Sequence, residues 1–398
     1  MPVNPIEILR VAARGDGVAA DGRHVALAAP GDHVTAAGEV LPGPHHREPP
    51  CRHFPKCGGC QLQHLDDATW SAFLEDRITT ALAAQELNAP IRTPHLSPPR
   101  TRRRAALHAE RRGRQVLLGF TEQSSHQLVD LAECHVLAPE LFALVAPLRG
   151  LLAAMIPGKR RVNVHLTMTD QGVDVLIDGL EAEGLAAAEA ITAFSYRHKL
   201  ARFSLDEGLG ASARWEPAPV TVTLGGVPVP FPAGSFLQAT PEGEGALVAA
   251  VREAIGEAAT VADLFAGLGT FSLALPRARV YAAEGARDPI LALKAGAGRA
   301  MRSVTVEHRD LFRRPLARAE LDRFAAVVLD PPRAGAREQV GELAASKTPV
   351  IAYVSCNPST FARDAETLCK GGYVLEWVQP VGQFRWSTHV ELAAKFRR

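Results

Sequence analysis

Two short apolar runs near the C-terminus each end at a tip that contains proline. Residues 327–329 run into Asp330-Pro331-Pro332, and residues 350–354 run into Ser355-Cys356-Asn357-Pro358. Uninterrupted runs of Val, Leu and Ile suit strands that are buried on both faces of a parallel sheet. Because open α/β sheets bind ligands just beyond the C-terminal ends of their strands, the carboxylate and the cysteine at these tips predict a reactive site.

Upstream, the chain repeats the arrangement of a buried strand followed by a polar or glycine-rich tip. Residues 260–273 predict a strand, a glycine turn and a helix start, and a second strand over residues 278–283 ends at Glu284. An acid at that place can hold ribose hydroxyls. The turn lacks the third glycine of a dinucleotide fingerprint, so the pattern favours a cofactor with adenosine but no phosphates, S-adenosylmethionine. Asp310, after the third strand, could meet the adenine.

The N-terminal half has a different pattern. Residues 6–45 alternate apolar and polar positions with glycine punctuation, which predicts a small β-barrel of the OB type, a fold often used on single-stranded nucleic acid. A generic β-module is an equal alternative. Residues 65–85 keep helical apolar spacing, and residues 140–235 mix strands with a helix near 181–194, which predicts an α+β unit.

Four of the six cysteines are candidates for one metal centre. They are Cys51, Cys57, Cys60 and Cys134. In a reducing compartment such a group is more often metal-binding than disulfide-bonded, and Cys356 and Cys369 lie in unrelated settings. Four thiolates suit zinc or a [4Fe–4S] cluster, and three clustered cysteines plus one remote cysteine favour the cluster. Three idle thiols are the alternative. His53 and His64 are expected to face solvent.

The chain has no overall basic excess, since 44 Lys and Arg residues balance 43 Asp and Glu residues for a net charge of +1. Any contact with nucleic acid must therefore come from local patches. Residues 100–114 hold seven arginines and one carboxylate, and Arg111-Arg112-Gly113-Arg114 predicts a hairpin turn between two strands. An exposed charged strand face is the default interpretation, but the density of arginine favours a surface that binds a polyanion.

Length and composition are typical of a globular protein with several domains. At 398 residues, with 47% hydrophobic and 22% charged residues, two or three domains are expected. No apolar run reaches the length of a membrane span, and the N-terminus lacks the basic-then-apolar pattern of a signal peptide. We therefore expect a cytoplasmic monomer with no membrane partner.

Specific motifs are spread over the chain. They are Gly234-Ser235-Phe236-Leu237-Gln238, residues 263–269, Asp330-Pro331-Pro332-Arg333-Ala334-Gly335, residues 355–364 and His389-Val390-Glu391. Together they closely resemble the RNA 5-methyluridine (uracil-C5) methyltransferases, over nearly the whole chain. The cysteine set resembles the iron–sulfur branch of that family, which is associated with 23S ribosomal RNA. Two positions depart from the family pattern: Thr240 replaces a common Asn, and Gly382-Gln383-Phe384-Arg385 replaces an Asp-x-Phe-Pro run.

The resemblance implies an α/β fold with an N-terminal barrel and a central domain. The implied units are an OB-like TRAM barrel over residues 1–48, an iron–sulfur cysteine loop over 49–64 with its fourth ligand at Cys134, a central α+β RNA-binding domain over 65–240, and a Rossmann-like S-adenosylmethionine methyltransferase domain over 241–398. It also implies that Cys356 is the nucleophile and Glu391 the base. The methyl-donor pocket would be lined by Gln238, Phe265, Glu284, Asp310 and Asp330.

The chemistry explains why these groups are needed. Carbon 5 of uracil is a poor nucleophile until a thiolate adds to carbon 6, so Cys356 should have a lowered pKa or a nearby proton acceptor. After methylation a general base, Glu391, must remove the proton on carbon 5 so that the cysteine can leave. A base inside a stack cannot reach the cysteine, which makes the expected partner a structured RNA with an unpaired or flipped uridine.

Three alternatives stay open at this stage. The same chemistry on transfer RNA is the main rival to 23S ribosomal RNA. An amino-methyltransferase also carries an Asp-Pro-Pro tip, but needs no cysteine and has an aromatic residue where this chain has Arg333. An RNA-binding protein with a degenerate methyltransferase fold would not need both Cys356 and Glu391.

Overall fold

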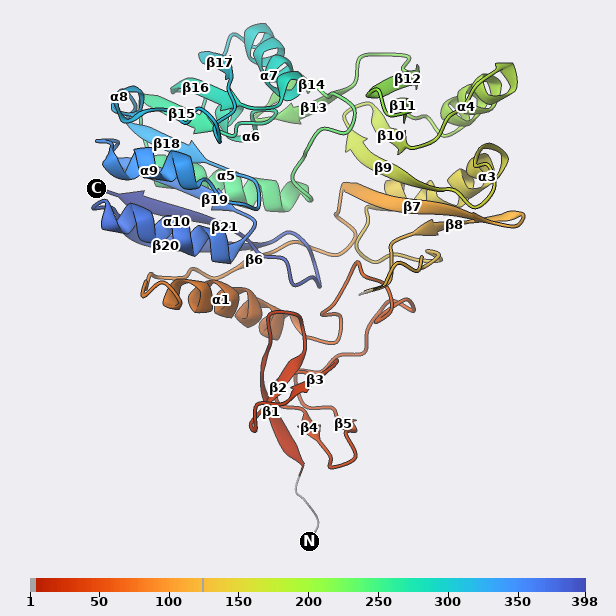
Figure 1. Cartoon of the computed structure of the whole chain (residues 1–398), viewed down its shortest axis with the longest axis horizontal. Helices are drawn as coiled ribbons and strands as arrows, with labels where there is room; N and C mark the ends of the chain where they lie inside the picture. Colours follow the sequence, from red (N-terminus) through yellow and green to blue (C-terminus); the bar gives the residue numbers. More distant parts are fainter. Residues whose placement is uncertain (1–4, 124) are drawn as a thin grey trace.

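The computed structural model of the chain describes residues 5–123 and 125–398, which form four sheets. Figure 1 shows the N-terminal sheet projecting below two larger halves, the central sheet on the right and the C-terminal sheet on the left. The first four residues of the expected 1–48 barrel lie outside the described residues. In the described ranges, no helix combines the length and the apolar character needed to cross a bilayer.

The N-terminal sheet is curled and antiparallel, and its short strands fit the expected small OB-like barrel. Its strand order is β3-β2-β1-β4-β5, and its strands are β1 (Ile6–Val11), β2 (Gly17–Ala19), β3 (His24–Val25), β4 (His33–Val34) and β5 (Val40–Leu41). Ile8 and Val34 lie in its small core. Buried Asp32 accepts a hydrogen bond from the backbone N–H of Gly43 at 2.7 Å, which fastens the chain beyond β5 to the sheet.

Helix α1 (Asp67–Ala83) lies within residues 65–85, the segment whose apolar spacing predicted a helix. Its N-cap is Asp66, whose carboxylate accepts a hydrogen bond from the N–H of Thr69 at 2.8 Å. The buried face of α1 packs into the core of the C-terminal sheet. The short strand β6 (His95–Leu96) pairs in parallel with β20 (Val374–Gly382) at one edge of that sheet. Both elements belong to the expected 65–240 unit in sequence, but they pack with the C-terminal half.

The central sheet has the order β12-β11-β10-β9-β7-β8. Its strands are β7 (Arg104–Arg112), β8 (Gln115–Gly119), β9 (Arg161–Thr169), β10 (Gly172–Asp178), β11 (Arg202–Asp206) and β12 (Ala211–Trp215). Leu107, Val164 and Phe203 face a core shared with the helices, which are α2 (Pro139–Ala143), α3 (Val145–Met155) and α4 (Leu185–Arg197). The alternate positions, such as His108 and its cross-strand neighbour Asn163, form a polar face on the other side.

The C-terminal sheet has the order β17-β16-β15-β18-β19-β21-β20-β6. Its strands are β15 (Thr260–Leu264), β16 (Arg279–Glu284), β17 (Val304–His308), β18 (Ala326–Leu329), β19 (Val350–Ser355), β20 (Val374–Gly382) and β21 (Glu391–Arg397). The first five run parallel, and β21 enters antiparallel between β19 and β20. A two-stranded hairpin precedes the sheet, β13 (Thr221–Leu224) with β14 (Val227–Pro230).

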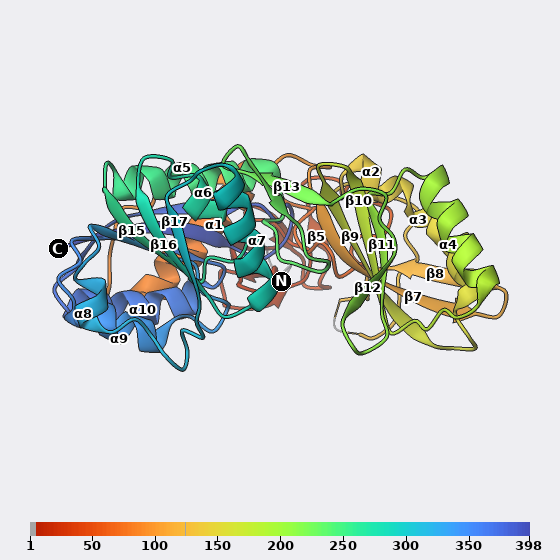
Figure 2. The ribbon, with the colours of Figure 1, turned by 90° about the horizontal axis from the view of Figure 1, so that it is seen from above.

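Helices cover both faces of the C-terminal sheet, so its strands are buried on both sides (Figure 2). The helices are α5 (Pro241–Ile255), α6 (Thr270–Leu273), α7 (Arg287–Arg299), α8 (Arg318–Leu321), α9 (Arg337–Ala345) and α10 (Pro358–Lys370). Val328 of β18 faces the α5 layer, whereas its neighbour Leu329 faces the layer of α9 and α10. The strand order reverses between β15 and β18, which confirms the predicted α/β architecture and marks the place where such sheets bind ligands.

Candidate active site

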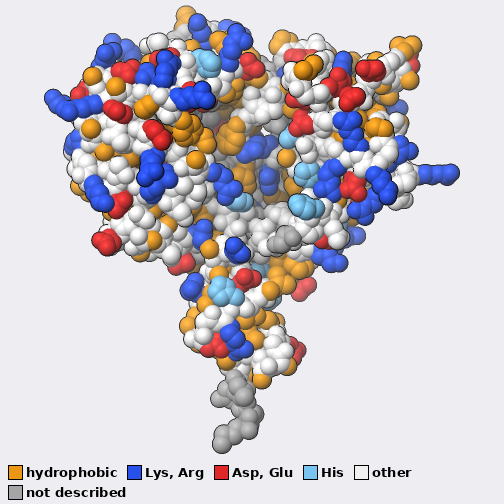
Figure 3. All heavy atoms as spheres, in the orientation of Figure 1, with side chains coloured by type: hydrophobic (Ala, Val, Ile, Leu, Met, Phe, Trp, Pro, Cys, Tyr) orange, Lys and Arg blue, Asp and Glu red, His pale blue; other side chains and the backbone are white. Residues whose placement is uncertain are grey.

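A cleft of about 730 Å³ lies at the C-terminal ends of the parallel strands. One wall comes from the tips of β15, β16, β18 and β19, and the other from Arg102, Arg104 and Ala106 at the start of β7 in the central sheet. Figure 3 shows the hollow between the two halves, with Lys, Arg and His side chains along its walls. The cleft is large enough for a nucleoside and a nucleoside cofactor together.

Six of the seven residues expected to act on the methyl donor or the base line this cleft. They are Gln238, Phe265, Glu284, Asp330, Cys356 and Glu391. The six residues come from six different strand tips and loops, separated by up to about 150 positions in the chain. Asp310 lies beside the tip of β16 but not among the lining residues, and its carboxylate accepts a hydrogen bond from the N–H of Phe312 at 3.0 Å. Its role toward the adenine stays a prediction.

Cys356 is held between the end of β19 and the start of α10. Asn357 is the N-cap of α10, and its side-chain oxygen accepts a hydrogen bond from the N–H of Ser359 at 3.1 Å. The Asn357 amide and the Thr360 hydroxyl both donate to the carbonyl oxygen of Arg333, each at 3.1 Å. These two bonds fasten the cysteine loop to the Asp330-Pro331-Pro332 loop, so the two predicted tips form one rigid unit.

The electrostatics around Cys356 oppose a free thiolate. Burial raises the pKa of the Cys356 thiol to about 11, and the carboxylates of Glu391 and Asp330 add to this effect, whereas Arg333 opposes it. The expectation of a lowered pKa is therefore wrong for the protein without substrate. The other half of that expectation, a nearby proton acceptor, is met by the Glu391 carboxylate, which lines the same cleft. The thiol can lose its proton only to such a neighbour.

Glu391 is the first residue of β21 and is 6% exposed. Burial raises its pKa to about 7, while a hydrogen bond from Gln383 and the charges of Arg104 and Arg333 oppose the shift. Burial also raises the pKa of Asp330 well above its usual range, and the charge of Glu391 contributes to that shift. A carboxylate whose pKa lies near neutral pH is well matched to accept and release a proton.

The loop after β15 forms the other end of the cleft. Phe265 has a φ of 64°, Gly267 of 54° and Gly269 of 90°, so the backbone turns through left-handed conformations. A Cβ on Gly269 would lie 2.3 Å from a methyl group of Leu293, so only glycine fits there. Glu284 accepts a hydrogen bond from the N–H of Gly267 at 2.9 Å, which closes the loop against the tip of β16 and leaves lone pairs for a ribose.

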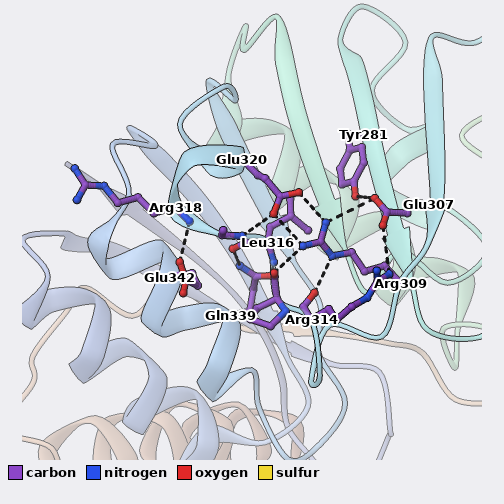
Figure 4. A network of polar contacts seen from close by, with 11 residues as sticks. Tyr281, Glu307, Arg309, Arg314, Leu316, Arg318, Glu320, Gln339 and Glu342 are labelled. Carbon is purple, nitrogen blue, oxygen red and sulfur yellow. Dashed lines mark hydrogen bonds and ion pairs between the residues drawn. The ribbon is translucent and has the colours of Figure 1, made fainter.

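A polar network fixes the segment that follows β17, next to this loop (Figure 4). The guanidinium of Arg309 donates to both oxygens of Glu320, at 2.8 and 2.9 Å, and to the carbonyl oxygens of Arg314 and Pro315, both at 2.7 Å. The hydrogen bond from Arg309 lowers the pKa of Glu320 to about 2. This clamp holds the turn that carries Asp310 and Phe312, whose ring centroid lies 5.4 Å from that of Phe265.

The four candidate ligand cysteines line one small cavity beside the catalytic cleft. They are Cys51, Cys57, Cys60 and Cys134. His53 accepts a hydrogen bond from the N–H of Ala132 at 2.9 Å, which brings the two cysteine segments together. His64 is buried at 1% exposure, so the expectation that it faces solvent is wrong. Within the described ranges, no three His, Cys, Asp or Glu side chains are arranged to hold a single metal ion.

The cysteine loop is also a wall of the catalytic cleft. Gly58, Gly59 and Arg102 line the cleft, and Gly59 and Arg102 line the cysteine cavity as well. The N–H groups of Gln61 and Leu62 donate to the carbonyl oxygen of Trp386, at 2.8 and 2.9 Å. Trp386 lies five residues before Glu391, so the cysteine loop supports the segment that leads into β21.

Comparisons with known proteins agree with this arrangement. The family model described as tRNA (Uracil-5-)-methyltransferase matches residues 231–397. An RNA methyltransferase of Zymomonas mobilis is 52% identical to this chain, over 98% of the chain and 99% of the relative. A 23S rRNA (uracil(1939)-C(5))-methyltransferase of Pectobacterium atrosepticum is 32% identical, over 92% of the chain and 83% of the relative. The chain belongs to the RNA (uracil-C5)-methyltransferase family.

A solved structure has the same fold. The tRNA (uracil-54, C5)-methyltransferase of Pyrococcus abyssi, in complex with S-adenosyl-L-homocysteine, superposes with a TM-score of 0.77 at 22% identity, over 98% of this chain and 99% of that one. The likeness therefore extends through all the sheets of this RNA (uracil-C5)-methyltransferase and confirms its fold class.

Some residues of the methyltransferase site were not predicted individually. The arginine run was interpreted as one surface, but its members divide: Arg102 and Arg104 line the cleft, and Arg103 donates to the carbonyl oxygen of Gln238 at 2.9 Å. Their alternation along a strand was the available signal. Gln383 was noted only as a departure from the family pattern, and nothing local in the sequence places it beside Glu391.

Proposed function

We propose that this enzyme methylates carbon 5 of a uridine in RNA, with S-adenosylmethionine as methyl donor and Cys356 as covalent nucleophile. The observation that carries the proposal is the convergence of Cys356, Glu391 and Asp330 on one cleft at the switch point of the sheet. The cleft also holds an acid and a glycine loop suited to an adenosine, which are Glu284 and residues 265–269. A donor without phosphates suits a loop that has no third glycine.

The Cys356 thiol first gives its proton to Glu391, which releases it to solvent, and the resulting thiolate adds to carbon 6 of the uracil. Addition places the electron pair of the former double bond on carbon 5 and on the adjacent carbonyl. S-adenosylmethionine supplies the methyl group that carbon 5 accepts, and S-adenosylhomocysteine is the leaving group. Covalent addition thus divides one difficult step into easier ones.

Glu391 then takes the proton from carbon 5. The electrons of that C–H bond form the double bond between carbon 5 and carbon 6 again, and the bond to the Cys356 sulfur breaks. With a pKa of about 7, Glu391 is partly ionised at neutral pH and can do this work. Asp330, whose pKa is held above its usual range, would be protonated and could donate a hydrogen bond to the uracil edge.

The RNA must present an unstacked uridine, because the sulfur lies inside the cleft. An exposed aromatic side chain lies at the cleft beside a part-buried basic one: Phe236 is 61% exposed, and the Arg104 guanidinium lies 4.5 Å from its ring centroid. Such a pair can stack on a base and bind its phosphate. The overall charge of +1 confines RNA binding to local surfaces of this kind.

We infer that the target is 23S ribosomal RNA. The relative from Pectobacterium atrosepticum, whose name gives 23S rRNA as its substrate, supports this target through 32% identity over most of both chains. Transfer RNA is the second candidate, since the family model and the Pyrococcus abyssi protein are both named for tRNA. The four cysteines favour the ribosomal target, because they resemble the iron–sulfur branch.

We also propose that the four cysteines hold a [4Fe–4S] cluster with a structural role. They line one cavity, and three clustered cysteines plus one remote cysteine favour a cluster over zinc. Burial raises the pKa of the Cys60 thiol to about 12, so the thiolates need bound metal to form. When bound, the cluster would cross-link the 51–60 loop to Cys134. The cross-link would fix the cysteine loop, which supports Trp386. Methyl transfer from a sulfonium needs no electrons.

The decisive experiment combines the purified protein, labelled S-adenosylmethionine and RNA from a strain that lacks the gene. Nucleoside mass spectrometry should find labelled 5-methyluridine in 23S ribosomal RNA, and Cys356→Ala should abolish it. Label in transfer RNA alone would show that transfer RNA is the substrate and that the reaction is the one proposed. Unchanged turnover by Cys356→Ala would overturn the covalent mechanism.

A further inference from the structure

The segment that leads into β21 turns back on itself at Arg385 and Trp386. The N–H of Ser387 donates to the carbonyl oxygen of Phe384 at 3.0 Å, which closes a four-residue turn with Arg385 second and Trp386 third. Trp386 has a φ of 57°, in the left-handed region that a bulky side chain rarely adopts. Strained backbone of this kind persists only where the surrounding structure holds it.

The two central residues of this turn do not favour it. Proline is favoured at the second position of a β-turn, and glycine or asparagine at a third position with positive φ. This chain has Arg385 and Trp386 at those positions, and Arg385 stands where the family pattern has a proline. Contacts from other parts of the fold must therefore hold the turn.

The guanidinium of Arg385 makes several of those contacts. It donates to the carboxylate of Asp67 at 2.5 Å and to the carbonyl oxygen of Ser97 at 3.2 Å. It also lies 5.4 Å from the ring centroid of Trp70 and 4.8 Å from that of Trp386. Since Asp67 and Trp70 lie in the first turns of α1, the guanidinium fastens the turn to that helix.

Trp386 makes the remaining contacts. Its carbonyl oxygen accepts from the N–H groups of Gln61 and Leu62, at 2.8 and 2.9 Å. Its ring packs in a small core with Cys60 and Val136. The strained turn is thus held both by α1 and by the cysteine loop, which are distant from it in the sequence.

The residues on either side of the turn face the catalytic cleft. Phe384, Ser387 and His389 all line it. The ring centroids of Phe384 and His389 lie 5.7 Å apart, and the Arg102 guanidinium lies 5.4 Å from the ring centroid of Phe384. Aromatic rings beside an arginine form the kind of surface on which unpaired RNA bases stack. The loop at residues 265–269 forms the other end of the cleft, so the methyl donor does not need this surface.

We propose that Arg385 is a positioning residue, which holds the turn so that Phe384 and His389 present a stacking surface to an unpaired base of the RNA. This inference rests on the proposed function, because it assigns this end of the cleft to the RNA substrate. Arg385 itself touches neither the RNA nor the methyl donor. Its contacts impose the turn that proline and glycine would favour through their backbone preferences.

Two substitutions of Arg385 in the full-length protein separate this role from others. Arg385→Met removes the hydrogen bonds and the charge. Arg385→Pro removes the same contacts and charge, but it supplies the residue that the second turn position favours. Within the described residues the N–H of Arg385 donates no hydrogen bond, so proline removes none from the backbone. Arg397→Met is the matched control, since Arg397 lies at the far end of β21 with a side chain that is 66% exposed.

The measurements are the Kd for 23S ribosomal RNA, by filter binding at one fixed salt concentration, and the Kd for S-adenosylmethionine, by calorimetry. Arg385→Met should weaken RNA binding about tenfold, as expected for the loss of one stacked base, and should change the Kd for S-adenosylmethionine by less than about twofold. Arg385→Pro should recover most of the RNA affinity. Because both variants lose the same charge, this recovery does not come from electrostatics.

Wild-type RNA affinity in Arg385→Met, or an equal loss in the proline and methionine variants, would overturn the inference. Equal weakening of both ligands by Arg385→Met would also overturn it, because the whole cleft would then have loosened. If Arg385→Met does not fold, a folded Arg385→Pro protein with wild-type RNA affinity supports the inference, and an unfolded or weakly binding one contradicts it. A wild-type protein that binds the RNA but forms no labelled 5-methyluridine would instead overturn the proposed function.

Discussion

Asp364 joins the two loops that carry the proposed catalytic groups, which makes it a sensitive point for both stability and activity. Its side chain is 1% exposed. One carboxylate oxygen accepts from the Tyr353 hydroxyl at 2.6 Å and from the N–H of Ala336 at 2.8 Å, and the other accepts from Arg363 at 2.7 Å. Ala336 follows the Asp330 loop, and Asp364 lies on α10, just after Cys356.

The cost of Asp364→Ala can be worked out from the donors that it leaves without a partner. Tyr353 is 0% exposed and Ala336 is 1% exposed, so neither the hydroxyl nor the N–H can turn to water. A buried donor without a partner costs about 1–3 kcal/mol, so the two together should lower the free energy of unfolding by about 2–6 kcal/mol. Tyr353→Phe removes one bond to the carboxylate and should cost about 1.5–3 kcal/mol.

Denaturant unfolding with urea checks these magnitudes, and a turnover assay checks the consequence for the site. Loosening the two loops by about an ångström should lower turnover by roughly 100-fold, beyond any loss of folded protein. Glu366→Ala is the control, because Glu366 lies on the same helix and forms an exposed ion pair with Lys370 at 2.7 Å, which is worth about 0.3–0.5 kcal/mol. An Asp364→Ala protein within about 1 kcal/mol of the wild type would refute the reasoning.

Three further predictions concern the base, the cofactor loop and the cysteines. Because the charged form of Glu391 is the base and its pKa is about 7, release of tritium from carbon 5 should fall about tenfold between pH 8 and pH 6, and Glu391→Gln should lose this limb. The sign is opposite for stability, since protonated Glu391 contributes stability below pH 4.5 that is lost as the pH rises through about 7. Arg309→Met should weaken binding of S-adenosylmethionine roughly tenfold in calorimetry while turnover at saturation changes little, because the clamp holds the Asp310 turn and touches no reacting atom. Cys60→Ser should lose bound iron and alter Trp386 fluorescence, and retention of both would remove the structural role of the cluster.

The residues that follow parallel strands were predictable from the sequence. Asp330 after β18, Cys356 after β19 and Glu284 at the end of β16 each end an apolar run, and the parallel arrangement brings such tips to one edge. The helix α1 and the hairpin between β7 and β8 were also predictable, because their periodicity and turn residues are local properties.

Partners from distant segments were not predictable from local pattern. Glu391 reaches Cys356 only because β21 enters antiparallel between β19 and β20, which nothing in the residues of β21 specifies. Likewise, the apolar face of α1 fits any core, and the structure places it on the C-terminal sheet and not on the central one. The arginines of residues 100–114 contact different things: some line the cleft, some bind backbone carbonyl oxygens and some face solvent. They differ because alternate residues of a strand face opposite sides.

The sequence by itself determined which groups this enzyme carries and which of them end strands, since strand burial and turn chemistry are encoded within a few residues. Only the tertiary structure decided the protonation of those groups. The pKa of Cys356 is raised, not lowered, because the fold buries the thiol and places Glu391 and Asp330 beside it. Burial and the charges of distant residues act through space, so they appear only when the whole chain has packed.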